Sequence, residues 1–145
     1  MAEKSPQNFA NHVRLDPPFH FFVLPVFAIS WIVSVVFAVR HLSFYSVWGV
    51  VLATAAVTAV LRIRIYSLKV QDRVIRLEER LRFATLLPES QRAQIAKLTE
   101  DQLIGLRFAS DEEVAGLVQR TLSENLSRAD IKKAVRNWRA DYWRV

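Results

Sequence analysis

Two uncharged apolar runs lie almost back to back near the N-terminus, and they restrict the fold more than any other feature. The runs cover residues 19–39 and 42–61, and only Arg40 and His41 separate them. A helix needs roughly 20 apolar residues to cross the hydrocarbon core of a bilayer, and each run has about that length. The sequence therefore predicts a transmembrane helical hairpin over residues 19–61.

The rest of the chain has the composition of a water-exposed helical region. Residues 62–145 carry 17 of the 20 Lys and Arg residues and 12 of the 14 Asp and Glu residues. A stretch of this length can form one small domain. We expect four parts along the chain: an N-terminal cytoplasmic or interfacial segment (1–18), the transmembrane hairpin (19–61), a basic juxtamembrane helical stalk (62–87) and a C-terminal α-helical cytoplasmic domain (88–145).

Several functional classes find no support in the residues. The chain has no cysteine, which excludes disulfides, thiolate metal sites and cysteine nucleophiles. It contains no zinc-protease motif or phosphate loop, and neither apolar run carries the internal charge usual in transporters. Although the net charge is +6, no helix-turn-helix or RNA-binding signature is present. We therefore expect no enzymatic activity and no nucleic-acid partner.

The second apolar run continues into a heptad-like pattern that predicts one long helix over residues 44–87. No Gly or Pro interrupts residues 62–87, and apolar residues recur there at alternating spacings of three and four. The central members of this stripe are Val70, Val74, Leu77 and Leu81. The stripe either joins copies of the chain as a coiled-coil seam or is the face on which the C-terminal helices pack.

Beyond Pro88, three capping signals predict further helices and therefore an all-α fold. Thr99 with Gln102, Ser110 with Glu113 and Ser127 with Asp130 each precede an apolar helical pattern. The predicted helices cover residues 89–97, 100–108, 111–125 and 128–142. Their apolar faces either pack as a small cluster on the stalk or bind a partner protein.

The C-terminal tail is rich in aromatic residues. A helix there would place Trp138 and Tyr142 on one face, with Trp143 beside them. Such a mixture is typical of a docking anchor or a membrane interface, and equally of a local core. Trp138, Tyr142 and Trp143 are therefore candidate partner-face residues, together with the stalk stripe.

Small residues mark a second candidate contact, within the membrane. Gly49, Ala53 and Ala56 share one face of the second apolar helix. Small residues at this spacing let helix backbones approach closely in lipid. We expect this face to pack against the first helix or against another copy of the chain.

Basic residues set the predicted orientation. Arg62, Arg64, Lys69 and Arg73 follow the second run, whereas the loop between the runs offers only Arg40. The positive-inside rule then places both termini in the cytoplasm. Near anionic headgroups each basic residue contributes about 1 kcal/mol, so we expect anionic lipids among the partners.

His20 and His41 raise the possibility of a cofactor. A neutral imidazole at a membrane boundary can be an axial ligand of haem or of a chlorophyll-type pigment. The two histidines lie at opposite ends of the first run, roughly 30 Å apart along a helix, so one copy cannot use both on one metal. Simple contact with headgroups is the alternative role, and we expect no cofactor as the default.

Three segments resemble a known family: LKVQDRVIRLEERLR (residues 68–82), QLIGLRFASDEE (102–113) and DIKKAVRNWR (130–139). They are similar to a family of small bacterial two-span membrane proteins catalogued as a domain of unknown function. The likeness covers nearly the whole chain, including residues 11–14 and 18–21. It implies a location in a bacterial membrane and adds no chemistry.

We therefore expect a non-enzymatic scaffold or accessory subunit that binds a larger membrane complex or copies of itself. One alternative is a haem- or pigment-contacting subunit of an electron-transfer or light-harvesting assembly. Another is a membrane-tethered adaptor that recruits a soluble protein through residues 111–143.

Overall fold

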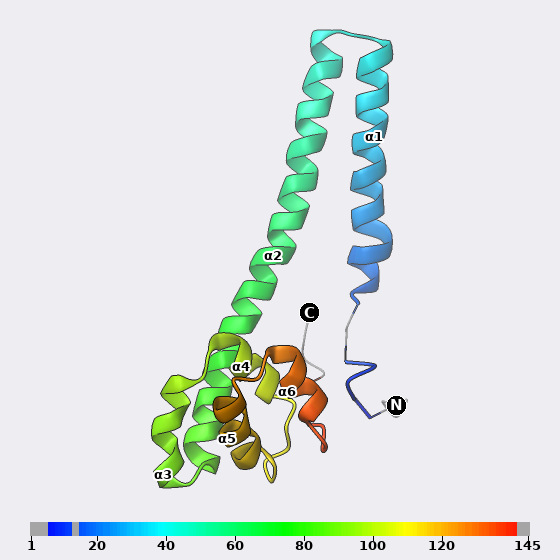
Figure 1. Cartoon of the computed structure of the whole chain (residues 1–145). Coiled ribbons are helices and arrows are strands. Elements are labelled where there is room, and N and C mark those ends of the chain that lie inside the picture. Colours follow the sequence, from blue (N-terminus) through cyan, green and yellow to red (C-terminus); the bar gives the residue numbers. More distant parts are fainter. Residues whose placement is uncertain (1–5, 13–14, 142–145) are drawn as a thin grey trace. The chain divides into compact units, whose positions relative to one another are not determined.

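In the computed structural model, which describes residues 6–12 and 15–141, every regular element is a helix (Figure 1). Two long helices come first, α1 (Leu24–Arg40) and α2 (Phe44–Leu86), with a π-helical segment η1 (Pro18–Val23) directly before α1. Five short elements follow: α3 (Glu89–Arg92), the 3-10 helix η2 (Ala93–Lys97), α4 (Glu100–Leu106), α5 (Val114–Glu124) and α6 (Arg128–Ala134). The predicted all-α class is confirmed.

The described residues divide into two compact units. The first comprises residues 15–69, and the second combines residues 6–12 with residues 70–141. The 43-residue helix α2 contributes to both units, so the prediction of one long helix starting at residue 44 is confirmed.

In the first unit, α1 and the first part of α2 form the predicted antiparallel hairpin (Figure 1). The indole Nε1 of Trp31 in α1 donates a hydrogen bond to Oγ1 of Thr54 in α2 (2.9 Å). Two serines start α2: Ser46 Oγ accepts the N–H of Ser43 (2.9 Å), and Ser43 Oγ accepts the N–H of Ser46 (3.2 Å). This reciprocal capping satisfies backbone donors at a helix start and ends the short turn after α1.

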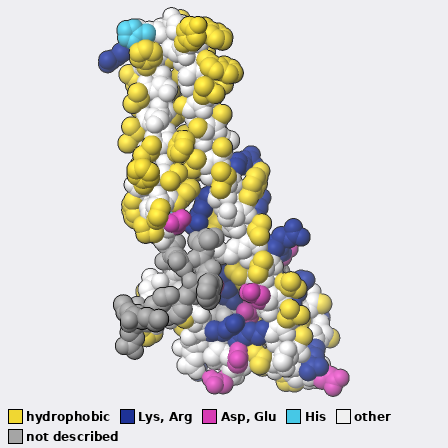
Figure 2. All heavy atoms as spheres, turned by 180° about the vertical axis from the view of Figure 1, so that it is seen from behind, with side chains coloured by type: hydrophobic (Ala, Val, Ile, Leu, Met, Phe, Trp, Pro, Cys, Tyr) yellow, Lys and Arg dark blue, Asp and Glu magenta, His cyan; other side chains and the backbone are white. Residues whose placement is uncertain are grey.

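The side chains of the hairpin are mostly apolar and exposed (Figure 2). The stretch Pro18–Arg40 and the helix α2 are both long and apolar enough to span a membrane, and very little of either apolar stretch is buried. A water-soluble protein would bury helices of this kind, whereas a bilayer accepts them as they stand. The hairpin therefore indicates insertion into a membrane.

The second unit has its own closed apolar core. The core takes residues from the end of α2, from α4, α5 and α6, and from the loops between them, and Ile95 of η2 packs against it. Its fully buried large members are Phe83, Leu87, Leu103, Leu106, Phe108, Val114, Val118 and Ile131. The apolar faces of the C-terminal helices pack against one another, so the alternative that they bind a partner protein is wrong.

Two of the three predicted caps start helices at the expected residues. Thr99 and Gln102 form a complete capping box at α4, with bonds of 3.2 and 2.9 Å, and Ser127 accepts the N–H of Asp130 at α6. Ser110 does not cap α5 in this way, because turns follow it and α5 begins only at Val114.

The helix predicted over residues 128–142 ends earlier than expected. α6 stops at Ala134, and Val135 has an extended backbone. The carboxylate of Glu113 accepts the backbone N–H groups of Arg136 and Asn137 (3.2 Å each). These bonds use donors that a continuing helix would need, so the prediction is wrong beyond residue 134.

The segment after α6 instead pairs with the loop after α4. Arg139 donates its backbone N–H to the carbonyl of Phe108 (2.8 Å), and Ser110 donates to the carbonyl of Asn137 (3.0 Å). Together they flank an antiparallel bridge between Ala109 and Trp138. Trp138 therefore lies on an extended segment and not on a helix. Tyr142 and Trp143, the other two candidate residues of the tail, lie outside the described residues.

Candidate interaction surface

Four apolar side chains on α2 face away from the core of their unit. Val70 is 61% exposed, Val74 48%, Leu77 61% and Leu81 63%. We call these four residues the α2 seam. They follow the apolar run in sequence and lie among charged residues, so a lipid-facing role does not account for them.

A different face of α2 packs on the C-terminal helices. Ile75 and Phe83 are 7% and 0% exposed, and Glu79 lies between them at 4%. At about 100° per residue, this face lies on the opposite side of α2 from the seam. The expectation that the C-terminal helices pack on the predicted stripe is therefore wrong.

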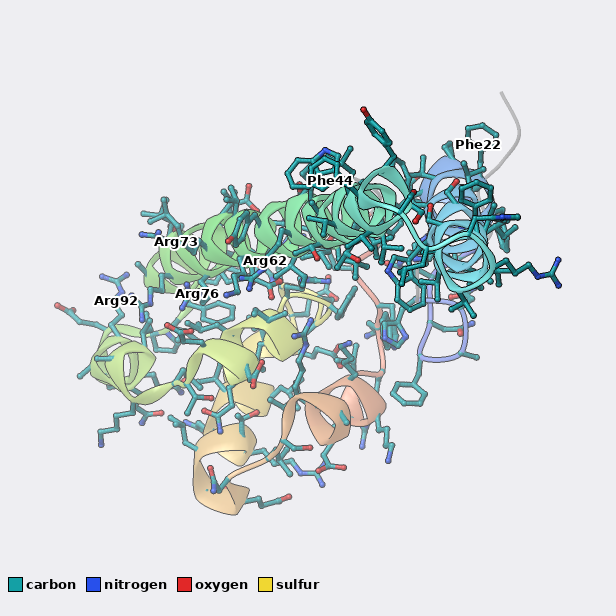
Figure 3. All side chains as sticks on the ribbon, turned by 90° about the horizontal axis from the view of Figure 1, so that it is seen from above. Phe22, Phe44, Arg62, Arg73, Arg76 and Arg92 are labelled. Atoms are coloured by element: carbon teal, nitrogen blue, oxygen red, sulfur yellow. The ribbon has the colours of Figure 1, made fainter. Side chains whose placement is uncertain are left out.

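The labelled arginines in Figure 3 show the same division. Arg76 points towards the C-terminal helices, where it forms an ion pair with Glu100 of α4. Arg73 points away from them, on the side of the seam. Arg73 and Glu78 flank the seam on its two edges, and within the described part of the chain neither has an ion-pair partner.

An ionic network around the buried Glu79 carboxylate holds α2 in this rotation. The Glu79 carboxylate accepts hydrogen bonds from Arg82 Nη1 (2.8 Å) and Arg139 Nη1 (3.0 Å). Arg82 also donates to Asp111 Oδ1 (2.6 Å from Nη2) and to the Ala109 carbonyl (2.7 Å). Because a buried carboxylate needs such partners, the network fixes which side of α2 faces inward.

Trp138, predicted as a candidate docking residue, takes part in the local core. Its ring lies 4.8 Å from the ring of Phe108 and 5.8 Å from that of His12, centroid to centroid. The adaptor alternative placed the binding surface for a soluble protein within residues 111–143. In that range, the ring of Trp138 packs against other residues of the same domain.

Residues 6–12, predicted to belong to a separate N-terminal cytoplasmic or interfacial segment, contribute to the second unit. His12 packs against Phe108 and Trp138, and its Nε2 lies 3.1 Å from Nζ of Lys132. Gln7 Oε1 accepts the backbone N–H of Asp141 (2.9 Å). The sequence signal for this packing was the aromatic pair Phe9 and His12 within a polar stretch. Their rings stack with centroids 5.6 Å apart.

The predicted small-residue face is the less exposed side of its part of α2. Gly49, Ala53 and Ala56 are each half-buried within the first unit. Among the described residues, a Cβ built on Gly49 would meet nothing within 4 Å, so none of their backbone approaches α2 closely at that residue.

Three of the four predicted headgroup-binding residues, Arg62, Lys69 and Arg73, share one face of α2, and Arg64 lies on the opposite side. Arg62 Nη1 lies 3.5 Å from the hydroxyl of Tyr66, and the Arg64 guanidinium lies 5.5 Å from the ring centre of Phe19. Arg62, Lys69 and Arg73 are exposed, as contact with headgroups requires, whereas Arg64 is half-buried.

The two candidate ligand histidines lie apart. His20 is half-buried, with Nδ1 2.8 Å from the carbonyl oxygen of Asp16. His41 is exposed at the end of α1, with its ring 5.0 Å from that of Phe37. Among the described residues, no group of three or more His, Asp or Glu side chains could hold a metal ion.

Comparison with known proteins gives a family without an activity. A family model described as a family of unknown function, DUF6526, matches residues 1–145. The chain belongs to DUF6526. No curated protein and no solved structure matches this DUF6526 chain. The candidate functional feature is the α2 seam, because its four apolar side chains are exposed.

Proposed function

We propose that this chain is a non-enzymatic membrane-anchored scaffold or accessory subunit that binds a larger membrane complex or copies of itself. The observation that carries the proposal is the α2 seam, four large apolar side chains that are 48–63% exposed beside a closed core. A contiguous exposed apolar patch rimmed by charge is typical of a protein-binding surface.

The proposed location is the bacterial inner membrane, with both termini in the cytoplasm. Arg62, Arg64, Lys69 and Arg73 support this orientation, because basic residues remain on the cytoplasmic side of a span. The packing of residues 6–12 on residues 108–141 agrees with it, since both segments must then lie on one side of the membrane.

Affinity purification from gently solubilised membranes tests the proposal. We expect the wild-type chain to be recovered with a stoichiometric partner, or as an oligomer, by mass spectrometry and native gel mobility. Leu77→Gln in the seam should reduce this recovery, whereas Leu86→Gln, on the other side of α2, should not. Recovery of the wild-type chain alone and as a monomer would contradict the proposal.

One observation favours a cofactor-contacting subunit as the second candidate. A histidine that ligates a metal usually donates its other ring N–H to a carbonyl or carboxylate. His20 Nδ1 lies 2.8 Å from the Asp16 carbonyl oxygen and would donate to it in the Nδ1-protonated tautomer, whereas in the other tautomer Nδ1 accepts the Asp16 N–H (3.2 Å). The purified complex would then absorb visible light at haem or pigment wavelengths, and His20→Ala would remove the band. A colourless complex would eliminate this candidate.

A further inference from the structure

We propose that the α2 seam binds the α2 seam of a second copy of this chain, as a parallel in-register coiled coil. This inference rests on the proposed function, because it names the partner of the same surface. It follows from the helical register of the seam, the charges beside it and the membrane anchor.

The register is that of a coiled coil. Val74 and Leu81 lie seven residues apart and occupy the a positions, and Val70 and Leu77 occupy the d positions. Val74 at a with Leu77 at d is the combination that favours two parallel strands, whereas Val70 at d and Leu81 at a have the reverse order and do not contribute to that preference. α2 is one uninterrupted helix through these residues, so all four side chains lie along one line of its surface.

The charges beside the seam fit a second copy of the same chain. In a parallel coiled coil, the g residue of one helix faces the e residue five positions later on the other. Arg73 is at g and Glu78 is at e, so each copy would place Arg73 opposite Glu78 of its partner. Both side chains are exposed and have no ion-pair partner among the described residues, so they are available for this pairing.

The membrane hairpin compensates for the shortness of the seam. Two heptads of coiled coil are marginal in solution, because helix association must overcome the loss of translational freedom. Two copies anchored in one bilayer with the same orientation already have parallel helices and a raised effective concentration. The ionic network around Glu79 turns the seam away from the C-terminal helices, so the domain leaves room for a second helix.

Charge reversal tests the register in the full-length protein, reconstituted in lipid vesicles and measured by energy transfer between labelled copies. Arg73→Glu alone, or Glu78→Arg alone, would create two like-charge pairs per dimer and weaken association about tenfold. The double variant R73E/E78R restores opposite charges and should return association to the wild-type level. Circular dichroism should show unchanged helix content for all three variants.

Disulfide trapping tests the geometry independently. The chain has no cysteine, so a single Leu77→Cys variant can form a disulfide only between copies. Residues at d meet their own symmetry mates, so oxidation should give a covalent dimer. Leu86→Cys, on the other side of α2, is the matched control and should remain monomeric.

The results separate this inference from the proposed function. Unchanged association in the single charge variants, failure of the double variant to restore it, or equal trapping at residues 77 and 86 would overturn the coiled coil. If another membrane protein still co-purified, the scaffold proposal would stand. A wild-type chain that is recovered alone as a monomer would overturn both.

Discussion

At the scale of single residues, Glu79 decides how α2 is turned. Its side chain is almost fully buried, and it accepts bonds from an arginine on its own helix and from Arg139, 60 residues later. A buried carboxylate without these cations would be strongly unfavourable. Burial of Glu79 therefore fixes Ile75 and Phe83 inward and leaves the α2 seam outward.

Replacement of Arg82 should lower the stability of the domain. Arg82→Met removes the bonds to Glu79, Asp111 and the Ala109 carbonyl, and it leaves the Glu79 charge with one partner. Breaking a buried pair from one side costs about 3 kcal/mol, so the free energy of unfolding should fall by about that amount. Urea unfolding of the full chain in detergent micelles, followed by tryptophan fluorescence, measures the change. Arg80→Met on the exposed face is the control, and equal stability of the two variants would contradict this role.

At the scale of elements, α4 and α6 cross unusually closely at a glycine. A Cβ built on Gly105 would lie 3.2 Å from Cγ2 of Ile131 and 3.3 Å from the carbonyl oxygen of Arg128. Both neighbours belong to α6, and one of the two atoms is backbone. The missing side chain therefore sets the distance between these helices.

Two glycine substitutions should have opposite effects on stability. Gly105→Ala should destabilise the domain by about 1–3 kcal/mol, because the added methyl group forces α4 and α6 apart. Gly116→Ala, inside α5 with nothing within 4 Å, should stabilise the domain by up to about 1 kcal/mol through helix propensity. Thermal unfolding of both variants measures the difference, and a stabilised Gly105→Ala variant would show that α6 can yield at this contact.

The elements that depend on local signals could be predicted from the sequence. Apolar length predicts the hairpin, the uninterrupted stretch before Pro88 predicts α2, and Thr99 with Gln102 predicts the start of α4. The packed face of α2 could not be predicted, because the seam is the more regular apolar stripe and the buried face contains Glu79. The early end of α6 depends on Glu113, a residue distant in sequence.

At the scale of the whole molecule, residues 6–12 and 70–141 belong to one compact unit, although the hairpin separates them in sequence. Two spans return the chain to the side from which it started, so this packing requires an even number of crossings.

Cysteine labelling of intact bacterial cells tests the proposed orientation. The two labelling variants are Leu42→Cys, in the turn between α1 and α2, and Ser90→Cys, in α3. A membrane-impermeant maleimide should label residue 42 directly and residue 90 only after lysis, because the positive-inside rule places the turn outside. Cysteine-free wild type is the control. Labelling of residue 90 in intact cells would reverse the orientation.

The contact of His12 with Phe108 and Trp138 also orders the steps of biogenesis. His12 leaves the ribosome long before its aromatic neighbours, and both spans must be inserted while it waits. The domain can thus close only after Trp138 has been synthesised, so its closure follows synthesis of the whole hairpin.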